Sequence, residues 1–259
     1  TLQDITGDRL PQLKRMFFQG AVALMNTNVA GTANLDSSYL TLGTGVRARA
    51  IELQPGYLAE DDFPTEAGTV AEVQQRRTGN STGAVLQPGI AALVASNNGL
   101  GYIVQPGVLG SALREAGYTT AVIGCADTDI PERPLVNFLM DTNGSVSFGY
   151  IGEDLFAKDQ NAPFGFWTSN EAVLSEIRRH KESANVIAIE WADLYRVEKY
   201  ALYCKPTQAI KMREAALDRL NQFLDGLWAE FGPEEYTMAV MSPFPGMDGL
   251  VRRQQLTPL

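Results

Sequence analysis

Histidine and cysteine are scarce in this chain of 259 residues, which has one histidine, His180, and two cysteines, Cys125 and Cys204. One histidine cannot build a metal pair that is held by several histidines. Two cysteines are too few for a disulfide scaffold or a cysteine-rich zinc site. Each lies in or beside an apolar run, which favours buried thiols, and a single disulfide between the two remains an open alternative.

Long apolar runs are missing as well. No run reaches the roughly 20 residues of a membrane-spanning helix, and no signal peptide is present. The chain begins at Thr1 rather than Met and ends at Leu259. This is typical of an excised or processed segment, so we expect the soluble part of a longer protein.

Positive charge is in the minority, with 21 basic against 30 acidic residues and a formal net charge of −9. Binding to a nucleic-acid backbone needs clustered lysine and arginine. The arginine pairs of this chain are isolated from one another. The charge balance therefore excludes nucleic acid as an expected partner.

The chain does contain a regular alternation of helix and strand patterns. Short apolar runs predict buried strands at residues 21–25, 119–124, 185–190 and 236–241. Apolar residues at helical spacing predict helices at residues 10–17, 69–77, 88–95, 109–116, 170–181 and 208–231. A further helix at residues 37–42 would have Asp36 or Ser37 as its N-cap. Residues 135–140 and 146–151 flank an Asp-Thr-Asn-Gly sequence, which predicts a β-hairpin.

This alternation predicts an α/β fold, a three-layer α/β/α sandwich with a mostly parallel central sheet. We expect one domain over residues 1–259. Residues 52–83 are rich in proline, glycine and charge. We expect them to form an insertion or lid-like excursion that contains the helix at residues 69–77.

Polar residues follow several predicted strands, and ligands bind beyond the carboxyl ends of parallel strands. The candidates are Thr32, Ser37 and Ser38 as a nucleophile loop, Asn26, Asn34 and Arg47 as ligand-binding residues, and Asp127 and Asp193 as metal ligands. Two carboxylates and a loop hydroxyl could hold one divalent cation such as Mg²⁺, Mn²⁺, Ca²⁺ or Zn²⁺. The alternative is that these residues cap helices and close turns. His180 is expected to lie solvated at a helix end.

The order of segments resembles the alkaline phosphatase superfamily, which includes phosphodiesterases, sulfatases and cofactor-independent phosphoglycerate mutases. Residues 10–45 resemble its opening helix, strand and nucleophile loop, and end in the expected Thr44-Gly45 pair. The segments LGSALREAGYTTAVIG, NVIAIEWADLYR and YTMAVMSPFP resemble later helices and strands of the family. The MNT, YLTLGTGVRA and SPxP features are similar to a branch of bacterial envelope proteins with phosphatase-like domains.

The chain departs from this family at its metal ligands. Where the family has Asp-His-Gly the sequence reads Ser242-Pro243-Phe244, and Val197 stands where an Asp-x-x-x-His pair would place histidine. A two-metal zinc site is therefore not expected. The resemblance implies a degenerate, non-catalytic or weakly active binding module of the bacterial cell envelope, with an anionic small molecule or an envelope protein as its partner. The alternative is a hydrolase or phosphotransferase for phosphate or sulfate esters that uses an all-oxygen metal site.

Overall fold

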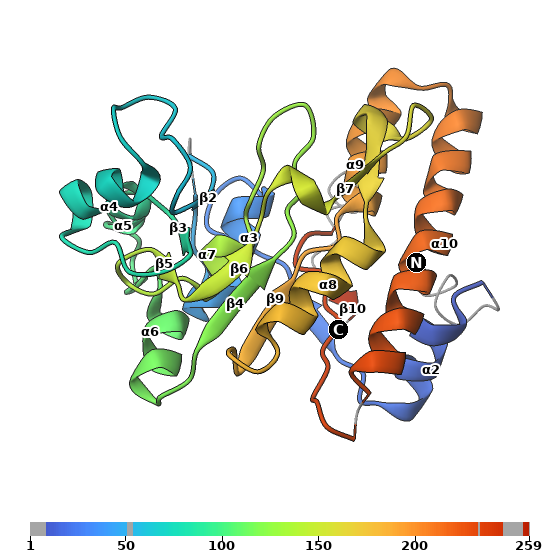
Figure 1. Ribbon diagram of the computed structural model, residues 1–259, viewed down its shortest axis with the longest axis horizontal. Helices are drawn as coiled ribbons and strands as arrows, with labels where there is room; N and C mark the ends of the chain where they lie inside the picture. Colours follow the sequence, from blue (N-terminus) through green and yellow to red (C-terminus); the bar gives the residue numbers. More distant parts are fainter. Residues whose placement is uncertain (1–8, 51–53, 233, 246–255, 259) are drawn as a thin grey trace. The chain divides into compact units, whose positions relative to one another are not determined.

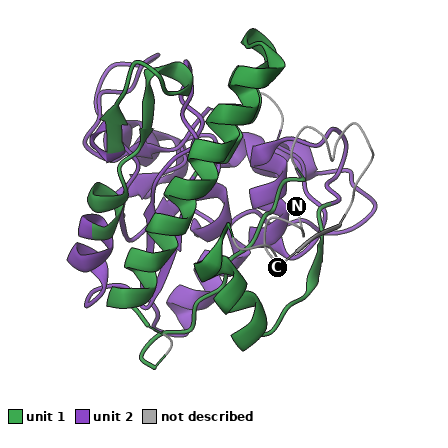
Figure 2. Cartoon of the chain, turned by 90° about the vertical axis from the view of Figure 1, so that its right-hand side faces the viewer, with its two compact units in different colours: residues 1–27, 156–174, 192–259 green, residues 28–155, 175–191 purple. Residues whose placement is uncertain are grey.

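A computed structural model describes residues 9–50, 54–232, 234–245 and 256–258. The chain divides into two compact units, shown in Figure 2. The first comprises residues 1–27, 156–174 and 192–259, and the second comprises residues 28–155 and 175–191. The prediction of one domain over the whole chain stays a prediction.

A parallel three-stranded sheet lies at the centre of the second unit (Figure 1). Strand β4 (Thr120–Ile123) lies between β6 (Phe148–Tyr150) and β9 (Val186–Ile189), and both neighbours run parallel to it. All four residues of β4 are buried, as the apolar run predicts. The strands expected at residues 119–124 and 185–190 are confirmed, and the chain is a mixed α/β protein.

A second sheet in this unit is antiparallel. It consists of β2 (Tyr57–Leu58), β3 (Val85–Leu86) and β5 (Ser145–Val146), with β3 in the middle. The hairpin predicted around residues 141–144 is wrong, because helix α7 (Val136–Leu139) precedes the turn and β5 pairs with β3. The turn itself forms, and the N–H of Gly144 donates to the carbonyl of Asp141 at 2.8 Å.

The helices of the second unit have clear local causes. Besides α7, the helical elements are α3 (Leu35–Thr44), α4 (Val70–Thr78), α5 (Ile90–Asn97), α6 (Val108–Glu115) and the short 3₁₀ turn η1 (Glu153–Leu155). Asn34 is the N-cap of α3 and accepts a hydrogen bond from the N–H of Ser37 at 2.7 Å, two or three residues before the predicted caps. The predicted helix at residues 69–77 is confirmed as α4.

The first unit contains helices and two small antiparallel pairs. Its elements are α2 (Pro11–Gln19), β1 (Leu24–Asn26), β7 (Phe156–Lys158), η2 (Pro163–Gly165), β8 (Phe166–Thr168), α9 (Asp193–Tyr200), η3 (Ala201–Tyr203), α10 (Pro206–Glu230) and β10 (Leu256–Pro258). β1 pairs with β10, and β7 pairs with β8. A buried core is formed by Ala162, Trp167 of β8, Val197 of α9 and Ala216 of α10. Helix α8 (Asn170–His180) belongs to the first unit up to Leu174 and to the second from Ser175.

Two predicted strands of the first unit are corrected. Residues 236–241 form no strand among the residues described, and Val240 and Met241 are 37% and 38% exposed. The run at residues 21–25 becomes a strand only from Leu24, which is 68% exposed. Apolar composition alone predicted burial in both cases. A strand is buried only where it pairs within a sheet and another layer of structure covers that sheet.

Helix α4 lies in the segment at residues 52–83 and begins with a capping box. Residues 52 and 53 lie outside the described part, and an insertion or lid-like excursion here stays a prediction. Thr69 Oγ1 accepts from the N–H of Glu72 at 3.3 Å, and the Glu72 carboxylate accepts from the N–H of Thr69 at 2.9 Å. We expect Thr69→Ala to lower the free energy of unfolding by about 1 kcal/mol. Urea denaturation measures this change, and Thr65→Ala, at an exposed residue before the helix, is the control. Equal stability of the two variants would show that the box contributes nothing.

Candidate functional site

The carboxyl ends of the parallel strands in the second unit carry a group of polar side chains. We call it the carboxyl-edge cluster, and it consists of Asp36, Tyr39, Asp127, Glu132, Arg133, Asn137 and Glu190. Gly124 and Glu190 each directly follow their strands, β4 and β9. A Cβ on Gly124 would lie 2.2 Å from the carbonyl oxygen of Glu190, and its φ is +98°. A glycine here therefore lets the two strand ends approach closely.

Helix α3 is tied to the end of β9 by one hydrogen bond. Tyr39 Oη donates to Glu190 Oε1 at 2.8 Å, and the Glu190 side chain is buried. Burial raises the pKa of Tyr39 well above its usual value, and the charge of Glu190 and the hydrogen bond to it raise that pKa further. Tyr39 is therefore a neutral donor at physiological pH and positions the Glu190 carboxylate.

Asp127 organises the loop after β4. Its Oδ1 accepts from the N–H of Glu132 at 2.8 Å, and its Oδ2 lies 3.3 Å from both Nε and Nη2 of Arg133. Arg133 also donates to the carbonyl of Gly56 at 3.3 Å. Both carboxylate oxygens of Asp127 are thus already engaged by the protein.

Asp36 is the titratable group of most chemical interest in the cluster. Burial and the charge of Glu132 raise its pKa from 3.8 to about 6, against a lowering effect of the hydrogen bond from Asn137. Asn137 Nδ2 donates to Asp36 Oδ1 at 2.9 Å, and Asn137 Oδ1 accepts from Gln87 Nε2 at 3.1 Å. Gln87 Oε1 accepts in turn from the N–H of Gly89 at 3.0 Å. This chain of amides fixes the carboxyl group, whose pKa suits a general acid or base near neutral pH.

Two of the three residues of the predicted nucleophile loop use their hydroxyls in hydrogen bonds to the backbone, and the third residue is exposed. Ser37 Oγ is buried, accepts from the N–H of Ala50 at 2.9 Å and donates to the carbonyl of Ala50 at 3.4 Å. Ser38 Oγ is also buried and donates to the carbonyl of Asn34 at 2.9 Å. Thr32 lies on the exposed surface before α3. The two serines therefore hold the start of the helix in place.

The predicted ligand-binding residues also have separate positions. Asn34 caps α3 and donates from Nδ2 to the carbonyl of Ala50 at 3.1 Å, so its side chain serves the helix start. Arg47 is exposed in the loop after α3, and its carbonyl accepts from Tyr102 Oη at 2.9 Å. Asn26 belongs to the first unit, at the end of β1. A joint role for these three residues stays a prediction.

Asp193 lies in the first unit, completely buried at the start of α9. Its Oδ1 accepts from Arg196 Nη1 at 2.7 Å and from the N–H and Oγ1 of Thr168, each at 2.8 Å. Its Oδ2 lies 3.5 Å from Arg219 Nε. A zinc pair of the family's kind does not fit these surroundings, because two arginines already occupy the carboxylate and Val197 stands at the expected histidine position.

His180 ends helix α8 as predicted, but its side chain is only 15% exposed, so the expectation of a solvated histidine is wrong. Its ring stacks on Phe148 with centroids 5.8 Å apart, and Nε2 lies 3.6 Å from Glu176 Oε2. Neither cysteine is part of a disulfide in the described residues; Cys125 is buried as expected and Cys204 is half-buried.

No protein-family model, curated protein or solved structure matches this chain. The interpretation of the site therefore depends on its own geometry. Within the described ranges, no three His, Cys, Asp or Glu side chains are grouped so that they could hold a metal ion. None of the described helices is both long enough and apolar enough to cross a membrane.

Sequence reasoning overlooked much of the carboxyl-edge cluster. Asn137 and Gln87 contact each other across 50 residues of sequence, and Asn137 contacts Asp36 across 101 residues. No local pattern marks such pairs. A signal was present for Glu132 and Arg133, because they follow Asp127 in the same charged loop directly after a buried strand.

Proposed function

We propose that this chain is a non-catalytic or weakly active binding module with an alkaline phosphatase-like three-layer α/β/α fold, from the bacterial cell envelope. The observation that carries the proposal is the state of Asp193. In the resemblance it stands for the central metal-ligand aspartate, yet its carboxylate is fully buried and bound by Arg196, Arg219 and Thr168. A carboxylate in these surroundings stabilises the fold and is not presented to a substrate.

The helix-start serines support the same conclusion. A serine nucleophile needs an accessible hydroxyl beside a general base or a metal ion. Ser37 and Ser38 are buried and hydrogen-bonded to backbone groups. Their hydroxyls are therefore part of the helix start and are not free to attack an ester.

The charge of the cluster bears on the kind of partner. Asp36, Glu132 and Glu190 bring carboxyl groups to the edge, while Arg133 is already paired with Asp127. An anionic small molecule would meet repulsion there. Of the two partners that the sequence suggests, an envelope protein that presents amide, hydroxyl or cationic groups fits this edge better.

A second function is favoured by one observation. The pKa of about 6 on the fixed carboxyl of Asp36 suits acid–base catalysis near neutral pH. Exposed Thr32, in the loop just before α3, would then supply the hydroxyl. The chain would in that case be a phosphate- or sulfate-ester hydrolase or phosphotransferase with an all-oxygen metal site.

Hydrolysis assays separate the two functions. With p-nitrophenyl phosphate, its diester and p-nitrophenyl sulfate, we expect the wild type to show no turnover above that of Asp36→Asn, with or without Mg²⁺, Mn²⁺, Ca²⁺ or Zn²⁺. Asp129→Asn is the matched control, because Asp129 is exposed on the loop that contains Asp127. Metal-dependent turnover that Asp36→Asn abolishes and Asp129→Asn retains would contradict the binding-module proposal and establish the hydrolase.

A further inference from the structure

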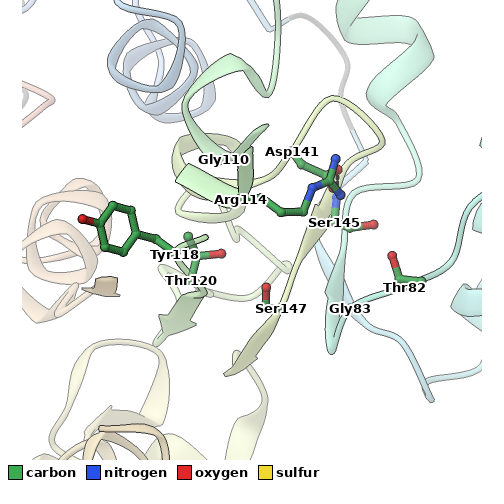
Figure 3. Close-up of a pocket in the computed structure, with 9 residues that line it drawn as sticks. All are labelled: Thr82, Gly83, Gly110, Arg114, Tyr118, Thr120, Asp141, Ser145 and Ser147. Atoms are coloured by element: carbon green, nitrogen blue, oxygen red, sulfur yellow. Dashed lines mark hydrogen bonds and ion pairs between the residues drawn. The ribbon is translucent and has the colours of Figure 1, made fainter. Parts of the chain in front are cut away.

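We propose that a pocket at the opposite edge of the parallel sheet binds a neutral, polyhydroxylated small molecule of about the size of one sugar ring. The pocket lies within the second unit and has a volume of about 230 Å³ (Figure 3). Its polar lining comes from Thr82, Arg114, Thr120, Asp141, Ser145 and Ser147. The inference does not depend on the function proposed for the carboxyl-edge cluster.

The position of the pocket follows from the register of the strands. Thr120 is the first residue of β4, and Ser147 directly precedes β6. Ala121 pairs with Phe148 in the parallel ladder, so Thr120 and Ser147 lie at the amino ends of neighbouring strands. The carboxyl-edge cluster is at the other ends of β4 and β9. The two sites can therefore be tested separately.

An unsatisfied hydroxyl points to a ligand in this pocket. Ser145 is 7% exposed, and its Oγ has no hydrogen-bond partner among the residues that the structure describes. Its N–H is already used, because it donates to Asp141 Oδ1 at 3.1 Å. A buried hydroxyl without a partner costs free energy, and a hydroxyl group of a ligand in the pocket would satisfy it.

The charged pair of the pocket favours a neutral ligand. Asp141 is 4% exposed; its Oδ1 accepts from the N–H groups of Asn143 and Ser145, and its Oδ2 is hydrogen-bonded to Arg114 Nη1. The two charges compensate each other, so the pair gives an anion little net attraction. The Arg114 side chain is half exposed, and its guanidinium has five N–H donors, of which some remain for ligand oxygens.

The remaining polar side chains of the pocket carry hydroxyl groups, which suit a polyhydroxylated ligand. Figure 3 shows Arg114 reaching toward Asp141 and Ser145, with the hydroxyls of Thr82, Thr120 and Ser147 around them. Serine and threonine hydroxyls donate and accept, as ligand hydroxyls do. Tyr118 also lines the pocket and is 50% exposed. The volume is below the roughly 300 Å³ at which pockets for drug-sized ligands begin, which restricts the ligand to a small molecule.

The test is isothermal titration calorimetry of the full chain with glucose, galactose, mannose, N-acetylglucosamine and myo-inositol, and separately with inorganic phosphate. We expect at least one polyol to bind, and Ser145→Ala and Arg114→Met each to weaken binding about tenfold or more. Asp129→Asn, at an exposed residue of the loop after β4, is expected to bind as the wild type does.

Thermal melts distinguish a loss of ligand binding from a loss of folding. Because Ser145 Oγ has no partner, Ser145→Ala is expected to melt no lower than the wild type without ligand, and to lose the rise in Tm that the polyol produces in the wild type. The proposal is overturned if none of the polyols binds, if phosphate binds instead, or if the Ser145 and Arg114 variants bind as tightly as the wild type.

Discussion

Asp193→Asn is expected to lower the free energy of unfolding by about 3–5 kcal/mol, because it leaves the positive charge of Arg196 buried without its counter-charge. Asp193 and Arg196 are both completely buried and lie 2.7 Å apart. The guanidinium also lies over the rings of Phe156 and Phe166, at 4.9 and 5.2 Å from their centroids. No solvent reaches the arginine to replace the lost carboxylate.

Urea denaturation at pH 7 measures this loss, and Asp218→Asn is the matched control. Asp218 pairs with Arg9 at 3.2 Å, but its side chain is 57% exposed, so we expect its loss to cost less than about 1 kcal/mol. Asp193→Asn combined with Arg196→Gln should cost less than the sum of the single variants, since each removes the same interaction. Similar small effects for Asp193→Asn and Asp218→Asn would show that the buried pair does not stabilise the first unit.

Asp36→Asn is expected to make the protein more stable at neutral pH and to leave it nearly unchanged at pH 4. The pKa of Asp36 is raised from 3.8 to about 6, so the folded protein binds this proton more tightly than the unfolded chain does. Stability is therefore lost as the pH rises from about 4 to 6, and the full penalty is present above pH 6. After allowance for the partly exposed carboxyl, the gain at pH 7 is about 2 kcal/mol.

Denaturation of the wild type and of Asp36→Asn at pH 4, 5.5 and 7.5 would show this dependence. Asparagine keeps an oxygen that can accept from Asn137 Nδ2, so the amide chain is preserved. Asp129→Asn, on the exposed part of the same edge, should have the pH dependence of the wild type. A difference between Asp36→Asn and the wild type that stays constant from pH 4 to 7.5 would mean that Asp36 does not titrate as its surroundings indicate.

Helices and buried strands of this chain were predictable where the local pattern and the packing agree. The long helix predicted at residues 208–231 is α10 (Pro206–Glu230), because its leucine stripe supplies an apolar face for α2 and α9. The strand β4 follows from an apolar run that is buried on both faces. Residues 236–241 are also mostly apolar and form no strand, because strand formation requires a pairing partner that composition does not reveal.

The candidate site was less predictable than the fold for a related reason. The sequence singled out Asp127 and Asp193 because polar residues after buried strands converge in a parallel sheet, and a shared role for the two stays a prediction. It could not indicate that Asp127 would be paired with Arg133, or that Asp193 would be enclosed by Arg196 and Arg219. Such pairings depend on contacts across long stretches of sequence, for which a single chain carries no local signal.

The order of strands in the parallel sheet also affects how the chain folds during synthesis. β4 is the central strand, but its neighbour β9 follows much later, and Thr119 bonds to Asn185 across 66 residues of sequence. A nascent chain that has emerged from the ribosome only as far as β6 lacks one side of the sheet and leaves an edge of β4 open. Because non-local parallel pairing is slow, this partly synthesised chain is the state in which chaperone protection matters most.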